Sequence, residues 1–400
     1  MDRGLRLTRL GLAVLLLATA LTLVAGLAAM APRPASASSR LMPVSPGTSG
    51  QAGVTRRSDR IARIVAHMTL RDKIGQLLVV SFGGTTAPAG TLRRLQPGGV
   101  IYFSDNLTTQ AQVRRLSRRV HAVSNRAGIP ALIGTDQEGG IVTRLPGPVS
   151  QLPGGAEFHG NATWARHVAH RTGTAMRRMG VDVDFAPVAD VNTAGPNGAI
   201  GVRSFGSTPK TVSRLVDAQI CGYHSTGTAT TIKHYPGLGS TTVDSHQALP
   251  HLHLSMSTWR HIHLPPFVHG IATGTNLVMV GHVAFHRLDP TGTPASLSRP
   301  MVTHWLRHRV GYSRVVITDS LTMGALSAYG TSGQLAVRAV EAGVDMLLMP
   351  AKPAGVVMGL LKAVHNDQIS VHRIDQSVTR ILRLKDRIGL VRGPGSIQSC

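Results

Sequence analysis

Residues 233–246, KHYPGLGSTTVDSH, bring an ammonium group, two imidazoles and a carboxylate to one glycine-rich loop. Lys233 and His234 end a β-like run, and Asp244 and His246 stand two positions apart further along the loop. An imidazole titrates near neutral pH, so it can both donate and accept a proton within one reaction cycle. Glycine gives the loop the conformational freedom to move. This composition indicates a site that binds a polar ligand and transfers protons.

Other polar residues stand where short apolar runs end. Counting the Lys-His pair, the set comes from four runs and consists of Asp136, Lys233, His234, His282 and Asp319. In a parallel barrel the carboxyl ends of the strands share one rim, and that rim holds the active site. The positions of these residues therefore predict one shared site.

Eight apolar, β-rich runs alternate with longer amphipathic segments. The runs span 74–82, 99–103, 131–136, 181–191, 228–235, 276–283, 314–320 and 344–350. Continuous apolar strands separated by helices are typical of a parallel sheet covered on both faces. Eight units predict an α/β protein with a (β/α)₈ TIM-type barrel as its single catalytic domain. The alternative is a doubly wound open sheet, but residues 81–90 lack the glycine spacing of its phosphate-binding turn.

Several separated motifs carry a resemblance to a known family. They are DQEGG (136–140), DVDFAPVADV (182–191), RSFG (203–206), KHYPGLGSTTVDSH (233–246), VMVGHVAF (278–285), PASLS (294–298), VVITDSLTMGA (315–325) and AVEAGVDMLLMP (339–350). From about residue 58 to 392, the chain resembles the single-barrel β-N-acetylglucosaminidases of glycoside hydrolase family 3. The resemblance implies a retaining exo-enzyme that removes terminal β-linked GlcNAc from cell-wall or chitin-type oligosaccharides. It also implies a covalent glycosyl–aspartate intermediate and no cofactor or metal.

The resemblance implies specific roles for three residues. Asp319 is the implied nucleophile, and His246 is the implied acid/base with Asp244 as its dyad partner. Asp319 must stay ionised, which requires cationic or hydrogen-bonding neighbours. Outside the motif, an aspartate just after a strand would be interpreted as a helix cap and DSH as a polar turn. The implied substrate-binding residues are Asp136, Arg203, Lys233, His234 and Met323.

Four positions depart from the family pattern. Leu238 stands where a second histidine is expected in the KH-aromatic-PGHG motif, and Ile141 stands where an arginine usually follows DQEGG. Ser320 replaces the aspartate that commonly follows the nucleophile, and His263 occupies a position that is usually acidic. None of the four removes the nucleophile or the dyad. Leu238 and Ile141 belong to the expected rim, so they bear on substrate preference or catalytic rate.

The chain is strongly basic, with a formal net charge of +23 at pH 7. Residues 1–38 contain four arginines and one aspartate, so their removal leaves +20. Such a surface attracts polyanions in a salt-dependent way, although a biased genome would equally account for heavy arginine use. Aromatic residues make up only 4% of the chain and are not interleaved with basic residues. We therefore expect an anionic cell-wall polymer as partner, and no nucleic acid.

The ends of the chain indicate export. Residues 1–38 combine three early arginines, a long apolar run and ASAS at 35–38, which predicts a signal peptide or membrane anchor. Residues 39–57 are a predicted flexible linker, 58–394 the barrel and 395–400 a tail. We expect an exported monomer that is secreted, associated with the cell wall, or anchored by an uncleaved N-terminal segment.

Cysteine and histidine usage adds little. Cys221 and Cys400 allow one bridge but no disulfide framework. The densest histidine cluster, at 251–263, lacks cysteine or carboxylate partners at ligand spacing, so we expect no metal site there.

Three other functions remain open from the sequence. A neutral histidine as acid/base would let phosphate enter the site, which makes a GlcNAc phosphorylase one alternative. A β-glucosidase of the same family is another, although the DSH motif disfavours it. A protein of a different class, one that binds the cell wall with weak or no turnover, would fit the departures from the family pattern and the basic surface.

Overall fold

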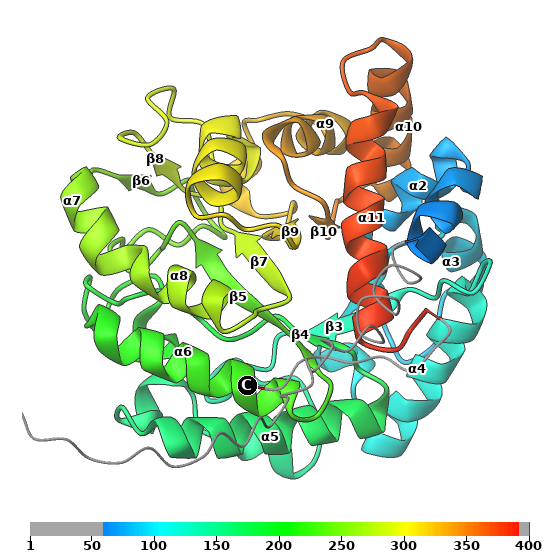
Figure 1. The fold of residues 1–400 in the computed structure, drawn as a ribbon. Coiled ribbons are helices and arrows are strands. Elements are labelled where there is room, and N and C mark those ends of the chain that lie inside the picture. Colours follow the sequence, from blue (N-terminus) through cyan, green and yellow to red (C-terminus); the bar gives the residue numbers. More distant parts are fainter. Residues whose placement is uncertain (1–58, 392–399) are drawn as a thin grey trace, which may run out of the picture. The chain divides into compact units, whose positions relative to one another are not determined.

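The structure is a computed structural model that describes residues 59–391 and Cys400. Eight parallel strands form its central sheet, in the order β10-β1-β2-β3-β4-β5-β7-β9 (Figure 1). The strands are β1 (Leu78–Val80), β2 (Gly99–Tyr102), β3 (Leu132–Thr135), β4 (Val183–Asp184), β5 (Ala229–Tyr235), β7 (Leu277–Val280), β9 (Val315–Thr318) and β10 (Leu347–Leu348). Each of the eight predicted runs contains one of these strands.

Hydrogen bonds join the two ends of the sheet. The Thr318 N–H donates to the Met346 carbonyl at 3.0 Å, and the Leu348 N–H donates to Thr318 Oγ1 at 3.0 Å. These bonds bring β9 beside β10 and nearly close the sheet into a barrel. The predicted (β/α)₈ fold is thus confirmed.

The strands are buried on both faces, as their unbroken apolar sequences predict. Every residue of β2, β3, β7 and β9 is buried. Space inside the barrel is tight at Gly134, where an added Cβ would lie 2.8 Å from the Phe185 ring. A glycine in β3 therefore lets the neighbouring aromatic ring fill the interior.

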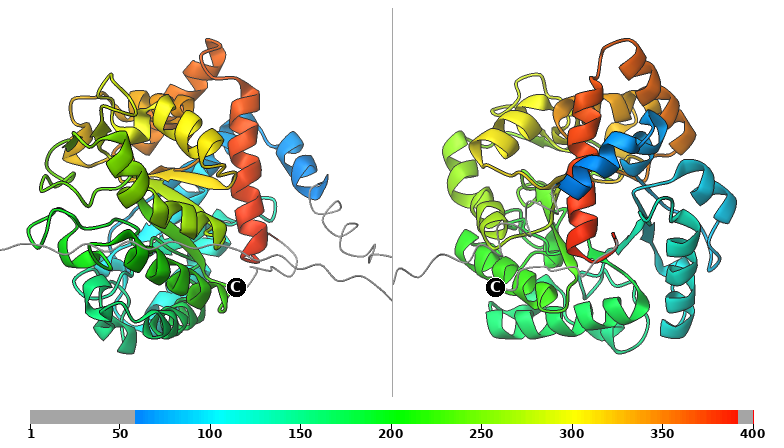
Figure 2. Two further views of the ribbon diagram at one scale, coloured as in Figure 1. Left: turned by 60° about the vertical axis from the view of Figure 1, so that its left-hand side comes forward. Right: turned by 45° about the vertical axis from the view of Figure 1, so that its right-hand side comes forward.

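Helices surround the barrel (Figures 1 and 2). The longer ones are α2 (Leu70–Gln76), α3 (Ala89–Leu95), α4 (Gln110–Ser124), α5 (Ala162–Met179), α6 (Pro209–His224), α8 (Pro265–Ala272), η7 (Pro300–Arg309), α9 (Ser332–Ala342), α10 (Pro353–His365) and α11 (Val371–Arg387). Their ends follow the sequence. Thr109, Asn161 and Thr208 cap the first turns of α4, α5 and α6 with side-chain oxygens. Gly180 ends α5 with a positive φ of 73°.

A second, two-stranded sheet was not predicted. It pairs β6 (His251–Leu252) with β8 (Ala284–Phe285) in parallel. The Ala284 N–H also donates to the Pro250 carbonyl at 2.9 Å. This small sheet fixes the far end of the loop that leaves β5 and carries residues 237–250.

The remaining predictions concern the two ends of the chain and the disulfide. Cys221 in α6 is bonded to Cys400, so the one conceivable bridge is present. The predicted signal segment, linker and most of the predicted tail lie outside the described residues. Among the described helices, none has the length and apolar character needed to cross a bilayer.

Candidate active site

A cavity of about 340 Å³ opens where the barrel strands end. Its lining includes all eight predicted site residues, from β5, the ends of β3 and β9, and the loops after β4, β5 and β9. They are Asp136, Arg203, Lys233, His234, Asp244, His246, Asp319 and Met323. The structure therefore brings together residues up to 187 positions apart in the chain, from Asp136 to Met323. Their chemical roles stay predictions.

Asp319 follows β9 directly and lies half-buried in the cavity. Its Oδ1 accepts a hydrogen bond from the Ser320 N–H at 2.7 Å. Burial favours the neutral acid, but the charges of His234 and His282, the Ser320 N–H and Lys233 together outweigh it. The pKa of Asp319 is therefore held below its usual value, and the side chain is a carboxylate at neutral pH.

Asp244 and His246 form a pair on the lip of the same cavity. Asp244 Oδ1 lies 2.8 Å from His246 Nδ1 and accepts the His246 backbone N–H at 2.9 Å. Because a carboxylate accepts but does not donate, Nδ1 carries the hydrogen and Nε2 is free for a ligand. The side chains of His246 and Asp244 are 70% and 48% exposed, so the pair remains open to solvent. Burial tends to raise the pKa of Asp244, but the two hydrogen bonds from His246 hold it below its usual value.

A buried carboxylate, Asp190, fixes the start of the loop that leads to this pair. Its Oδ2 accepts the His234 N–H at 3.1 Å and lies 2.7 Å from His234 Nδ1, and its Oδ1 accepts the Leu238 N–H at 2.7 Å. Close packing also explains the glycines. Gly237 has a φ of 120°, and a Cβ on Gly239 would lie 1.9 Å from the Val191 carbonyl oxygen. Backbone conformation and close packing therefore account for these two glycines, and the mobility of the loop stays a prediction.

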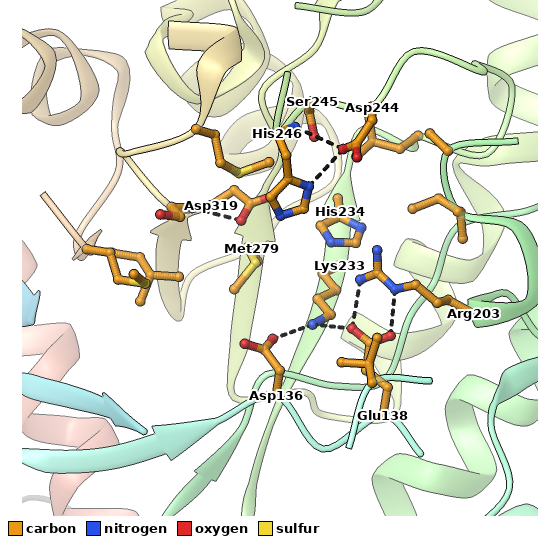
Figure 3. Close-up of a pocket in the computed structure, with 18 of the residues that line it drawn as sticks. Asp136, Glu138, Arg203, Lys233, His234, Asp244, Ser245, His246, Met279 and Asp319 are labelled. Atoms are coloured by element: carbon orange, nitrogen blue, oxygen red, sulfur yellow. Dashed lines mark hydrogen bonds and ion pairs between the residues drawn. The ribbon is translucent and has the colours of Figure 1, made fainter. Parts of the chain in front are cut away.

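Lys233 is buried between two carboxylates on the floor of the cavity (Figure 3). Its Nζ lies 2.6 Å from Asp136 Oδ1 and 2.6 Å from Glu138 Oε1. Arg203 forms two hydrogen bonds to the Glu138 carboxylate. Its Nε lies 2.8 Å from Glu138 Oε2 and its Nη2 lies 2.7 Å from Glu138 Oε1. Burial alone would raise the pKa of Glu138, but Lys233 and Arg203 hold it far below the usual range. Glu138 thus fixes both cations while Asp136 keeps its second oxygen for a ligand.

Glu138 is the clearest functional residue that the sequence reading missed. The E138Q variant keeps the shape of the side chain but leaves Lys233 and Arg203 short of one negative charge. Because an uncompensated buried charge is costly, we expect the free energy of unfolding to fall by roughly 3 kcal/mol. We also expect KM to rise more than kcat falls, since the ammonium and guanidinium groups lose their fixed positions. Urea denaturation and steady-state kinetics measure the two effects. E157Q is the matched control, because Glu157 accepts one backbone N–H, from Gly154, and lies outside this cavity.

Arg144 is a second residue in the cavity that the sequence reading did not identify. Its guanidinium lies 6.0 Å from the centre of the Phe103 ring, and its buried Nε has no hydrogen-bond partner within residues 59–391 and Cys400. The signal was present, since Arg144 follows the DQEGG motif by four positions. Arg144 supplies a third cation to the cavity besides Lys233 and Arg203.

The four residues that depart from the family pattern differ in how deeply they are buried. Leu238 is buried and lines the cavity, and Ser320 lines it with its Oγ 2.8 Å from Thr322 Oγ1. Ile141 is 73% exposed and lines a neighbouring groove that shares Glu138 and Arg203 with the cavity. His263 is buried, and burial lowers the pKa of its imidazole. Its two ring nitrogens have no hydrogen-bond partner in the described part of the chain.

His282 was expected at the rim, but it does not line the cavity. Its Nδ1 lies 2.7 Å from Ser296 Oγ, and its Nε2 donates to the Ser320 carbonyl at 2.9 Å. Burial lowers the pKa of this imidazole. His282 therefore braces the backbone next to Asp319 from behind.

Asp184 ends β4 beneath the cavity and is fully buried. Its Oδ1 accepts the Gln137 N–H at 2.9 Å. Burial raises the pKa of Asp184 to about 8, although the Gln137 N–H and the Tyr223 side chain lower it. The folded state therefore holds a proton that the unfolded state releases near pH 4.

This difference predicts a pH-dependent stability. Between about pH 4 and pH 8 the native state binds more protons than the unfolded state, so the free energy of unfolding falls as pH rises. Each pKa unit corresponds to about 1.4 kcal/mol. Urea midpoints at pH 5 and pH 8 should therefore differ less in D184N than in the unmodified protein. Equal pH dependence in both proteins would contradict a protonated Asp184.

Histidines gather a second time near the small sheet. The rings of His251 and His253 stack on His286, with centroids 5.2 and 5.5 Å apart. Within the described residues, no group of three or more His, Cys, Asp or Glu side chains has an arrangement that would hold a metal ion.

A (β/α)₈ barrel whose rim joins an ionised aspartate, a His–Asp pair and a cation–carboxylate cluster has the parts of an enzyme for polar, hydroxyl-rich substrates. The family model described as "Glycosyl hydrolase family 3 N terminal domain" matches residues 69–384. The chain therefore belongs to glycosyl hydrolase family 3.

Individual relatives have matching descriptions. The chain is 28% identical to Beta-hexosaminidase A of Pseudoalteromonas piscicida over 373 residues, covering 80% of this chain and 62% of that protein. The solved glycoside hydrolase family 3 beta-N-acetylglucosaminidase from a Paenibacillus species is 39% identical, with a TM-score of 0.77, covering 83% of this chain and 65% of that one. The Beta-N-acetylhexosaminidase from Beutenbergia cavernae is 28% identical, with a TM-score of 0.71, covering 80% and 99%. The chain thus spans less than two thirds of the first two relatives.

Proposed function

We propose that the protein is a retaining exo-β-N-acetylglucosaminidase that releases terminal β-linked GlcNAc from cell-wall or chitin-type oligosaccharides. The observation that carries the proposal is that ionised Asp319 and the His246–Asp244 pair line one cavity. The names of the relatives support GlcNAc as the sugar that is released, and membership of glycosyl hydrolase family 3 supports hydrolysis of a glycosidic bond. We also propose export, on the basis of residues 1–38.

In the first step, a carboxylate oxygen of Asp319 attacks the anomeric carbon. The bond from this carbon to the leaving oxygen breaks, and that oxygen takes the proton from His246 Nε2. Asp244 accepts the Nδ1 hydrogen throughout, which stabilises the imidazolium before the proton is transferred. The products are the shortened glycan and a glycosyl ester on Asp319.

In the second step, His246 Nε2 takes a proton from a water molecule as the water oxygen attacks the same carbon. The ester bond breaks and returns the carboxylate of Asp319. Two displacements at one carbon restore the β configuration of the sugar. The low pKa of Asp319 suits both steps, because the group is a nucleophile first and a leaving group afterwards.

The floor of the cavity suits the hydroxyl groups of a single sugar. Asp136 accepts hydrogen bonds with its second oxygen, and Lys233, His234 and Arg203 offer donors. Met323 adds a buried apolar surface for the methyl of the acetamido group. A volume of about 340 Å³ is at the small end for ligand pockets, which favours one terminal sugar over an extended chain.

Covalent trapping tests the proposal. The reagent is a 5-fluoro glycosyl fluoride that carries a 2-acetamido group, and peptide mapping locates the label. We expect Asp319 to be labelled. Labelling of another carboxylate, or of none while the protein turns over aryl GlcNAc, would contradict this mechanism. A labelled Asp319 would also exclude a protein that only binds the cell wall.

Phosphorolysis is a second candidate, because Arg144 places a cation at the cavity whose buried Nε has no hydrogen-bond partner among the described residues. Phosphate in place of water would release GlcNAc 1-phosphate. Product analysis with and without phosphate separates the two reactions, and we expect free GlcNAc in both cases. Parallel assays on aryl GlcNAc and aryl glucose test the β-glucosidase alternative.

A further inference from the structure

Three consecutive helices on one flank of the barrel carry arginine and no acidic residue. α3 contributes two arginines, and α4 and α5 contribute four each. The helices connect β1 to β2, β2 to β3 and β3 to β4, so they follow one another around the barrel (Figures 1 and 2). We call these ten exposed residues the arginine face: Arg93, Arg94, Arg114, Arg115, Arg118, Arg119, Arg166, Arg171, Arg177 and Arg178.

The charge of the arginine face is almost unopposed. Within residues 59–391 and Cys400, Arg177 alone among the ten forms an ion pair, with Asp182 at 3.3 Å. Asp182 is buried and also lies 3.1 Å from His121 Nε2. The four arginines of α4 stand in two pairs four residues apart, which puts like charges on neighbouring turns. Such pairs destabilise a helix, and a bound anion would offset the repulsion.

The α5 part of the arginine face borders a hollow of about 330 Å³ between α5, the first residue of α4 and the short helix η2 (Pro148–Gln151). Arg171 and Arg178 line it, together with the polar side chains of Gln110, His170 and Thr174. Among the described residues, no acidic side chain lines it. Guanidinium groups bind phosphate oxygens with paired hydrogen bonds, so a concave, cationic surface without carboxylates suits phosphate groups.

We propose that the arginine face binds a polyol-phosphate polymer of the cell-wall type, a flexible chain of phosphodiester groups. This binding goes beyond the proposed hydrolysis and does not depend on it. It would hold the enzyme on anionic cell-wall material through one flank and leave the cavity at the strand ends open.

Two other polyanionic partners fit the arginine face less well. Nucleic acid binding commonly uses aromatic side chains for base stacking, but α3 and α4 expose none, and the exposed Trp164 of α5 packs edge-on against Phe158. Membrane binding commonly inserts apolar side chains. α3 and α4 expose no large apolar side chain, so they offer charge without an insertion surface.

The test compares two quadruple variants of the full chain that lose the same charge. The first is R114Q/R115Q/R118Q/R119Q on α4. The control is R287Q/R299Q/R309Q/R383Q, which replaces exposed arginines elsewhere that form no ion pair in the described structure. Titration calorimetry with purified poly(glycerol phosphate) over a range of salt concentrations measures affinity. We expect the α4 variant to bind at least about tenfold more weakly at low salt. The slope of the logarithm of the binding constant against the logarithm of the salt concentration should be shallower by up to about 3. The control should keep most of the affinity, and both should hydrolyse aryl GlcNAc normally.

Several results would overturn the proposal. They are an equal loss of affinity in the control, tighter binding of duplex DNA of matched charge, or binding to anionic vesicles without binding to the polymer. If the α4 variant fails to fold, R171Q/R178Q in the hollow repeats the test with a smaller expected loss. Circular dichroism and aryl GlcNAc turnover report folding in each case.

Discussion

D319A is expected to lower kcat/KM for aryl GlcNAc substrates by roughly 10³-fold or more. Asp319 is the ionised carboxylate at the end of β9, and the positive groups around it are arranged to keep it charged. No neighbouring side chain takes its place, because Asp136 and Glu138 are engaged with Lys233. Steady-state kinetics on an activated aryl glycoside measure the loss.

A chemical rescue makes this prediction sharper. Azide should enter the space left by the carboxylate and attack the anomeric carbon of an activated substrate, giving an α-glycosyl azide. S320A is the matched control, since it changes the next residue but keeps the nucleophile, and it should lose less than about tenfold. If D319A kept a tenth of the original rate, or if azide gave the β product, Asp319 would not be the nucleophile.

The barrel was predictable because its signal is physical and long-ranged along the chain. Eight runs that are apolar on both faces leave few arrangements other than a parallel sheet wrapped in helices. The lengths of the strands were harder to predict from the sequence. β4 and β10 have two residues each within much longer apolar runs. The sheet of β6 and β8 gave no signal at all, since two residues are too short to show an alternating pattern.

The site was predictable as a set of strand-end residues but not as a network. Four of the five strand-end residues, Asp136, Lys233, His234 and Asp319, line the cavity because strand ends share a rim, whereas His282 lies behind it. How they pair was not visible in the sequence, since pairing depends on burial. A fully buried lysine needs opposite charge, and Lys233 obtains it from both Asp136 and Glu138. The same reasoning applied to His234 would have pointed to Asp190 as its partner.

The loop glycines have a second explanation that their number in the sequence did not reveal. Their number suggested a mobile loop, but Gly237 and Gly239 are held where a side chain would not fit. The exposed part begins later, at Thr242, and carries Asp244 and His246. Composition alone does not separate a glycine that permits motion from one that permits close packing.

H246A is expected to slow the reaction most for substrates whose leaving group must be protonated before it departs. Substrates with alkyl or sugar leaving groups should lose roughly 10²- to 10⁴-fold in kcat/KM, because they depart only when protonated. Activated aryl glycosides with acidic phenols should lose far less in the glycosylation step. A plot of log kcat/KM against leaving-group pKa should therefore become steeper in H246A than in the unmodified protein.

Two further variants separate the acid from its partner. D244N keeps the imidazole but removes the carboxylate that accepts its Nδ1 hydrogen, so its slope should lie between those of H246A and the unmodified protein. H251A is the matched control, because it removes another exposed imidazole that lies outside the cavity. Equal losses across good and poor leaving groups in H246A would exclude His246 as the acid. A change in slope confined to H246A and D244N would identify the pair on the lip as the group that protonates the departing oxygen.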